Sequence, residues 1–135
     1  MEIWQRRWDE DQKGRGYYEI QKTVTTKDYN ERSRRDERSI TRLRLGHTGL
    51  NSTLFTMGKT ESNRCGNCGE IENVKHVLLR CESYAEEREE LCDKVQEEGR
   101  EWDIMGILGA EGKGVGLVRK ALLKYLNDTR LSNRI

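Results

Sequence analysis

Four residues of this sequence have the types and spacing of a metal site: Cys65, Cys68, His76 and Cys81 form the pattern C-x2-C-x7-H-x4-C. Three thiols and one imidazole are the donors of a closed structural zinc site, since Zn²⁺ there prefers four tetrahedral sulfur or nitrogen ligands. A catalytic zinc site would instead keep one position open for water or substrate. The pattern therefore predicts a module held together by Zn²⁺ as its cofactor, and not metal catalysis.

The residues around these ligands predict how they are positioned. Gly66 and Gly69 flank the second cysteine, where a tight knuckle turn needs backbone freedom. Asn73 is a suitable N-cap for a helix that carries His76. His76 and Cys81 are five residues apart, which is about 140° around an ideal α-helix, so they cannot share one face of it. We therefore expect the helix to end or bend at Cys81.

A second helix is predicted to follow the last ligand. Ser83 and Glu86 have the spacing of a capping box, and Leu91, Cys92 and Val95 form an apolar stripe after it. We interpret Cys92 as a core residue of this helix and not as a metal ligand.

Arginines gather on another predicted helix, before the metal pattern. At about 100° per residue, Arg35, Arg38 and Arg42 share one face, while Ile40, Leu43 and His47 lie roughly opposite. His47 is therefore predicted to be packed and hydrogen-bonded. Arginine binds phosphate bidentately, which favours nucleic acid; a solvated face paired with neighbouring carboxylates is an equally weighted alternative. The candidate nucleic-acid contacts are Arg34, Arg35, Arg38, Arg42 and Arg44.

Composition limits both the core and the partners. Charged residues make up 36% of the 135 residues and there is a single Phe, so the core must be thin and a metal or partner must supply part of the folding free energy. Net charge is +4 over residues 1–64, −7 over 65–110 and +4 over 111–135. This is not the uniformly basic charge of many nucleic-acid binders, so any contact with a polyanion must be local.

No segment of the sequence has the pattern of a membrane span or of a secretory signal peptide. The sequence has no apolar run near the ~20 residues of a membrane span, and its first twenty residues are not a signal-peptide core. We therefore expect an intracellular protein, nuclear or cytoplasmic, with no membrane partner. Thiols stay reduced in these compartments, which favours metal ligation over disulfides.

Several segments together resemble a known family. The run RLRLGHTGLNSTLF, from Arg42 to Phe55, precedes the metal pattern, which contains HVLLRC and is followed by YAEERE. Over residues 39–92 this resembles the zinc-binding region at the C-terminal end of non-LTR (LINE-type) retrotransposon reverse transcriptase polyproteins. Residues 4–15 resemble the connector that follows an RNase H domain there. The resemblance implies a module that holds RNA or an RNA–DNA template near a reverse transcriptase, with upstream polymerase domains as possible partners.

Catalytic motifs of such polyproteins are missing from this sequence. It has no Tyr-x-Asp-Asp box of a reverse transcriptase. It also has no Walker A loop for nucleotide binding, because Lys113 in GAEGKGVG is followed by Gly114 instead of Ser or Thr. We expect no enzymatic activity and no small-molecule substrate. The alternatives to nucleic-acid binding are a zinc-stabilised protein-interaction or scaffold module that docks through the acidic helix from Glu82 to Glu101, or a non-functional truncated transposon relic.

The predicted fold is mainly α, a small helical domain organised around a CCHC zinc knuckle. Any β structure is expected as a short ribbon near residues 17–24 or at the knuckle. We divide the chain into a connector (1–29), the helical zinc-binding module (30–98) and a glycine-rich flexible joint with a C-terminal helix (99–135). This last helix should pack on the helices of the zinc region or on a partner.

Overall fold

Helices make up the regular structure of the protein. The computed structural model describes residues 2–24 and 33–135. Within these, the β pairing is limited to one isolated antiparallel bridge at the knuckle, between Arg64 and Ile71, so the mainly helical prediction is confirmed. The α-helices are α1 (Glu2–Glu10), α2 (Arg15–Ile20), α3 (Arg34–Leu45), α4 (Asn51–Thr56), α5 (Ala85–Glu97), α6 (Ile104–Leu108) and α7 (Val115–Asp128), joined by a π turn (His76–Arg80) and 3-10 turns (Glu82–Tyr84, Leu131–Arg134).

Two of the sequence-based boundaries differ from the structure. Residues 15–20 form α2, so of the two places predicted for β structure the knuckle has the bridge and residues 17–20 do not. The helix after the last ligand begins at Ala85, after a 3-10 turn. Its N-cap residue is Tyr84, whose side chain makes no capping hydrogen bond, so the predicted capping box at Ser83 is wrong. The predicted division between residues 29 and 30 lies outside the described residues.

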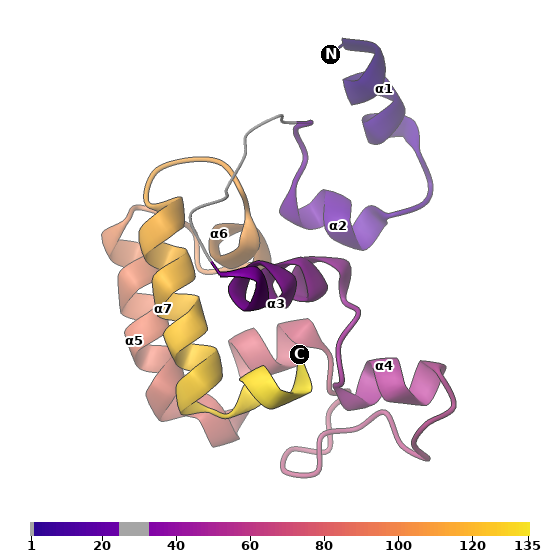
Figure 1. The fold of residues 1–135 in the computed structure, drawn as a ribbon, viewed down its shortest axis with the longest axis vertical. Coiled ribbons are helices and arrows are strands. Elements are labelled where there is room, and N and C mark those ends of the chain that lie inside the picture. Colours follow the sequence, from indigo (N-terminus) through magenta and orange to yellow (C-terminus); the bar gives the residue numbers. More distant parts are fainter. Residues whose placement is uncertain (1, 25–32) are drawn as a thin grey trace.

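Helices α5 and α7 lie side by side and form the scaffold of the domain (Figure 1). Leu91 and Val95 of α5 are buried, as are Leu122 and Leu126 of α7. The predicted packing of the C-terminal helix on the metal-region helices is therefore confirmed. Cys92 lies next to this seam but is only half-buried, so its interpretation as a core residue is only partly correct.

The core of the scaffold also contains the π turn His76–Arg80, which we call the metal-bearing turn because it carries the predicted ligand His76. Val77 and Leu78 of the π turn are fully buried in the same apolar cluster as the two long helices. The buried Tyr125 hydroxyl of α7 donates a hydrogen bond to the Val77 carbonyl oxygen. Burial raises the pKa of Tyr125 to about 12, so the hydroxyl remains a donor throughout the neutral range. Helix α7 thus holds the turn directly.

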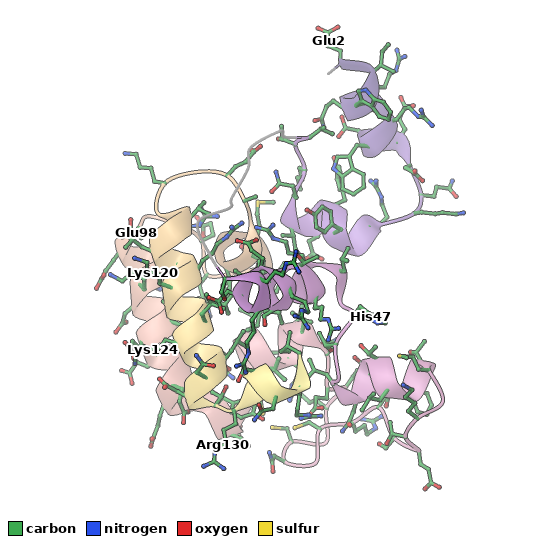
Figure 2. The ribbon with its side chains drawn as sticks, viewed as in Figure 1. Glu2, His47, Glu98, Lys120, Lys124 and Arg130 are labelled. Carbon is green, nitrogen blue, oxygen red and sulfur yellow. The ribbon has the colours of Figure 1, made fainter. Side chains whose placement is uncertain are left out.

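Helix α3 has clear sequence signals at both ends. The Ser33 hydroxyl accepts a hydrogen bond from the Asp36 amide at 3.2 Å, and Gly46 ends the helix in the left-handed conformation, at φ 71°. Ile40 and Leu43 are buried on one face and the arginines lie on the other, which confirms the predicted amphipathic helix. His47, however, is exposed and points away from the body (Figure 2), because the chain turns at Gly46 and leaves the helical face. The prediction of a packed His47 is wrong.

The first two helices form a hairpin around Trp8. Its ring makes edge contacts with Tyr17 and Tyr18, and its indole Nε1 donates to the Gln21 carbonyl oxygen at 2.9 Å. Helix α2 then lies against α3 and α6 (Figure 1), with Ile20 buried in the core. The second half of the predicted connector is therefore packed on the helical domain.

The glycine-rich segment between α6 and α7 is held by Arg100. Its guanidinium donates to the carbonyl oxygens of Gly106 at 2.7 Å, Glu111 at 2.8 Å and Lys113 at 3.2 Å. A Cβ at Gly114 would lie 2.5 Å from the Glu98 side chain, so only glycine fits there. Several carbonyl oxygens of the segment are therefore hydrogen-bonded to one guanidinium, at the place where the sequence predicts a flexible joint.

Replacing Arg100 should therefore destabilise the domain. We expect Arg100→Lys to lower the free energy of unfolding by about 2 kcal/mol, since an ammonium cannot serve several carbonyls in one plane and leaves some of them unsatisfied. Urea denaturation of the metal-loaded protein would measure this. Arg130→Lys, at an exposed side chain, is the matched control and should change little. Equal stability of both variants would contradict the role assigned to Arg100.

Candidate metal centre

The four predicted ligands come together in the structure. The donor atoms of Cys65, Cys68, His76 and Cys81 all lie within 4.8 Å of one another. Two sulfur to sulfur distances are 3.9 Å (Cys65 to Cys81) and 3.5 Å (Cys68 to Cys81), far beyond the ~2.05 Å of a disulfide. Such a cluster of reduced thiols and one imidazole can hold a metal ion.

A tight turn presents the first two cysteines. The Cys65 amide donates to the Glu70 carbonyl oxygen at 2.7 Å, and the Gly69 amide donates back to the Cys65 carbonyl oxygen at 2.9 Å. Gly69 has a φ of 74°, a conformation that residues with a Cβ rarely adopt, which explains this glycine of the predicted knuckle. The Arg64 guanidinium closes the turn from outside through the Gly69 carbonyl oxygen, at 2.7 Å.

A π turn brings the last two ligands to one side. The Asn73 side chain accepts a hydrogen bond from the His76 amide at 2.9 Å, which confirms the predicted N-cap. The Cys81 amide then donates to the His76 carbonyl oxygen at 2.8 Å, five residues back. In an α-helix the bonded residues are four apart, so this wider turn places Cys81 over His76 where an α-helix would separate them. The expected bend at Cys81 is confirmed, and a π turn produces it.

The His76 ring has its two nitrogens in different surroundings. Its Nδ1 lies 3.2 Å from Glu70 Oε2, whereas Nε2 is buried and has no hydrogen-bond partner in the described part of the chain. With the proton on Nδ1 donated to the carboxylate, Nε2 is free to donate its lone pair to a metal. Glu70 was not singled out from the sequence. A carboxylate between two ligand positions was the available signal.

Glu72 ties the metal loop to two other segments. Its side chain is 4% exposed, accepts a hydrogen bond from the Asn51 amide at 2.9 Å and forms an ion pair with Arg134. Asn51 in turn donates through its side chain to the Arg64 carbonyl oxygen at 2.8 Å. One buried carboxylate thereby joins the first turn of α4, the loop and the final 3-10 turn.

The segment before α4 is fitted to the same final turn. The Gly49 amide donates to the Arg134 carbonyl oxygen at 2.6 Å, and a Cβ at Gly49 would lie 2.8 Å from that oxygen. Leu50, the next residue, is fully buried in the core. Within the run from Arg42 to Phe55, these contacts explain why position 49 is a glycine and position 50 is apolar.

Cys81 is the most deeply buried thiol of the cluster. Burial raises its pKa to about 11, although hydrogen bonds from Ser83 act in the opposite direction. Arg88 of α5 donates to the Cys81 carbonyl oxygen and fixes the backbone beside it. At neutral pH this thiol holds its proton until a metal ion displaces it.

Metal affinity should therefore depend steeply on pH. The free thiol is protonated below its pKa and the bound form is a thiolate, so binding releases a proton and affinity rises with pH. We expect about a tenfold loss of affinity per pH unit of acidification for each proton released. Competition with a chromophoric chelator between pH 6 and pH 8 would measure the dependence. A flat profile would contradict thiolate ligation.

Glu70 should influence metal affinity without being a ligand. Because its carboxylate orients His76, we expect Glu70→Gln to weaken metal binding by about 10- to 100-fold. The same chelator competition measures this, with Glu89→Gln on the exposed side of α5 as the control. If both variants bind the metal equally well, the hydrogen bond to Nδ1 does not contribute.

The candidate nucleic-acid contacts lie away from the ligand cluster. Arg34, Arg35, Arg38 and Arg42 are exposed on α3. Arg44 differs, because it is half-buried and its Nε donates to the Leu108 carbonyl oxygen of α6 at 2.8 Å. Its position serves packing between α3 and α6, so the remaining four arginines are the better candidates for an external partner.

The final 3-10 turn links the arginine face to the metal centre. Arg42 donates to the Ile135 main-chain oxygen at 3.1 Å, and Arg134, next to it, pairs with Glu72 of the metal loop. The metal centre and the arginine face are thus separate sites on one frame.

Comparison with known proteins finds similarity to retrotransposon polyproteins. The chain is 41% identical over 86 residues, 62% of its length, to the Retrovirus-related Pol polyprotein from type-1 retrotransposable element R1 2 of Nasonia vitripennis. It is 33% identical over 113 residues, 80% of its length, to the corresponding R1 3 polyprotein and 28% identical over 113 residues to that of R1 4, both from the same organism.

The similarity covers only part of these relatives. The chain spans 20% of the R1 2 polyprotein, 28% of R1 3 and 29% of R1 4. No protein-family model and no solved structure matches the chain. The matches show homology to a portion of R1 Pol polyproteins. In the structure itself, no helix of residues 2–24 and 33–135 has the length and apolar character to cross a membrane.

Proposed function

We propose that this chain is a zinc-stabilised nucleic-acid-binding module, most suited to RNA, that corresponds to the zinc-binding region near the C-terminal end of non-LTR retrotransposon polyproteins. The module is non-catalytic and acts inside the cell beside polymerase domains. The observation that carries the proposal is the exposed face of α3, where Arg34, Arg35, Arg38 and Arg42 stand on a helix fixed by the metal-held frame.

Zinc is the metal that best suits the donor set. Two sulfurs bound to Zn²⁺ at about 2.3 Å in a tetrahedron lie about 3.8 Å apart. The two sulfur distances to Cys81, 3.9 Å and 3.5 Å, bracket this value. Soft thiolates also favour zinc over hard cations such as Mg²⁺ or Ca²⁺. A closed set of four ligands gives zinc a structural role.

The arginine face suits a phosphate backbone for electrostatic reasons. Guanidinium groups bind phosphate oxygens with two parallel hydrogen bonds, and several of them on one helix concentrate positive charge where the backbone of a strand can lie. Two other features support a nucleic-acid partner. The relatives are named as Pol polyproteins, and the acidic helix α5 is a different element from α3, so it need not repel a strand that follows α3.

Protein docking is the second candidate function. Leu45, Phe55 and Met57 are exposed by 62%, 47% and 48% at the end of α3 and along α4. Three large apolar side chains near one another in the sequence, beside the metal loop, suit a neighbouring polymerase domain or scaffold partner. A truncated and non-functional transposon relic would carry the same fold and bind neither partner.

Salt dependence of RNA binding would separate these functions. We expect zinc-loaded protein to bind a labelled RNA hairpin with strong salt sensitivity, measured by fluorescence anisotropy. Replacing Arg35, Arg38 and Arg42 by Gln should reduce the slope of log affinity against log salt, by about 0.7 for each phosphate contact that is lost. Chelation of zinc should abolish binding as the frame loosens.

The control removes the same charge elsewhere. Lys113, Lys120 and Arg130 are exposed cations on other segments, and their replacement by Gln should leave the slope nearly unchanged. Equal slopes for the two triple variants would reject the arginine face as the contact. No RNA binding at low salt by folded, zinc-loaded protein would favour the docking function.

A further inference from the structure

A small polar pocket lies between α3 and the end of the described chain. Its volume is about 120 Å³, and its lining comes from two segments far apart in the sequence: Arg35, Arg38, Ser39 and Arg42 of α3, with Ser132 and Ile135 of the final turn. No carboxylate side chain lines it. The pocket is distinct from the rest of the arginine face, because Arg34 does not contribute to it.

Side chains of the pocket are partly held in place. Arg42 donates to the Ile135 main-chain oxygen at 3.1 Å, which links the two segments that line the pocket. The Ser39 hydroxyl donates to the Arg35 carbonyl oxygen at 3.1 Å, so Ser132 is the hydroxyl left to donate into the pocket. The final turn is itself fixed by the Arg134 to Glu72 ion pair. Both walls of the pocket therefore belong to the rigid part of the domain.

Three guanidinium groups line this pocket and no acidic side chain does, which favours an anion there. Arg35 and Arg38 are three residues apart on α3, and Arg38 and Arg42 are four apart, spacings at which like charges repel on a helix. No salt bridge relieves any of these arginines within residues 2–24 and 33–135. A dianionic or monoanionic phosphate would remove this repulsion and receive planar hydrogen bonds from the forks.

The lining of the pocket favours one kind of ligand. Guanidinium and hydroxyl groups donate hydrogen bonds to phosphate oxygens, and the lining offers no aromatic side chain on which a base could stack. We propose that Arg35, Arg38, Arg42 and Ser132 form a socket for a single phosphate group of a nucleic acid. This inference rests on the proposed function and makes one phosphate of the strand a fixed reference point.

Inorganic phosphate is the first probe. In the zinc-loaded protein of residues 1–135, phosphate titrated at constant ionic strength should shift the NMR signals of the Arg35, Arg38 and Arg42 guanidinium groups in a saturable manner. Sodium chloride at the same ionic strength should not produce these shifts. Ser132→Glu places a carboxylate in the socket and should abolish saturation, and Arg38→Gln should weaken it at least tenfold. Lys120→Gln, an exposed cation on α7 outside the pocket, is the matched control and should leave saturation unchanged.

RNA-binding measurements on the same variants distinguish a failure of the socket from a failure of the proposed function. Loss of RNA affinity in Ser132→Glu, but little loss in Lys120→Gln on the exposed side of α7, would support the socket. RNA binding that Ser132→Glu and Arg38→Gln leave intact, together with unsaturable phosphate shifts, would overturn the socket while the nucleic-acid function stands. Saturable phosphate shifts without RNA binding would retain the pocket as an anion site but reject it as a nucleic-acid contact.

The position of the phosphate in the strand is decided by two matched oligonucleotides. One carries a 5′-phosphate and the other a 5′-hydroxyl, with the same sequence. Tighter binding of the first that disappears in Ser132→Glu assigns a terminal phosphate to the socket. Equal binding of both, equally weakened by Ser132→Glu, assigns an internal phosphate.

Discussion

The hydrogen bond from the Cys81 amide to the His76 carbonyl oxygen is the constraint on which the metal centre depends. It closes a turn one residue wider than an α-helical turn and thereby sets two ligands on the same side of the chain. A π turn is unfavourable by itself, so the surrounding structure must maintain it. Tyr125 satisfies the Val77 carbonyl and Arg88 satisfies the Cys81 carbonyl, each from a different long helix. The α5 and α7 pair is therefore part of the metal site.

The dependence also runs from the metal to the fold. The same short segment supplies His76 to the ligand cluster and Val77 and Leu78 to the core. A metal ion that fixes the segment consequently orders residues packed on both long helices, and loss of the ion frees a buried π turn. The Glu72 to Arg134 pair extends this coupling to the last turn of the described chain. A chain with so many charged residues obtains a single arrangement through these few buried links.

Much of this arrangement could be predicted from the sequence. The ligand spacing, the Asn73 cap and the pattern of apolar and arginine positions on α3 each depend on residues close together in the sequence. Such local features can be predicted from the sequence alone. The features that could not be read from the sequence depend on a turn or on contacts between distant residues. His47 leaves the helical face because Gly46 turns the chain, Arg44 donates to the Leu108 carbonyl oxygen of another helix, and Arg100 donates to carbonyl oxygens of the glycine-rich loop. The sequence indicated only that an α-helix could not place His76 and Cys81 together. It did not indicate that a π turn would do so.

The Tyr125 hydroxyl has a consequence for how this protein can be observed. Its bonding partner, the Val77 carbonyl, is adjacent to a metal-ligating residue, and the ring is 2% exposed in the core. Near-ultraviolet absorption and circular dichroism of a tyrosine respond to the hydrogen bond of its hydroxyl and to the rigidity of its surroundings. Tyr125 is thus a built-in optical reporter of the metal-bearing turn, and it needs no added label or chromophoric metal.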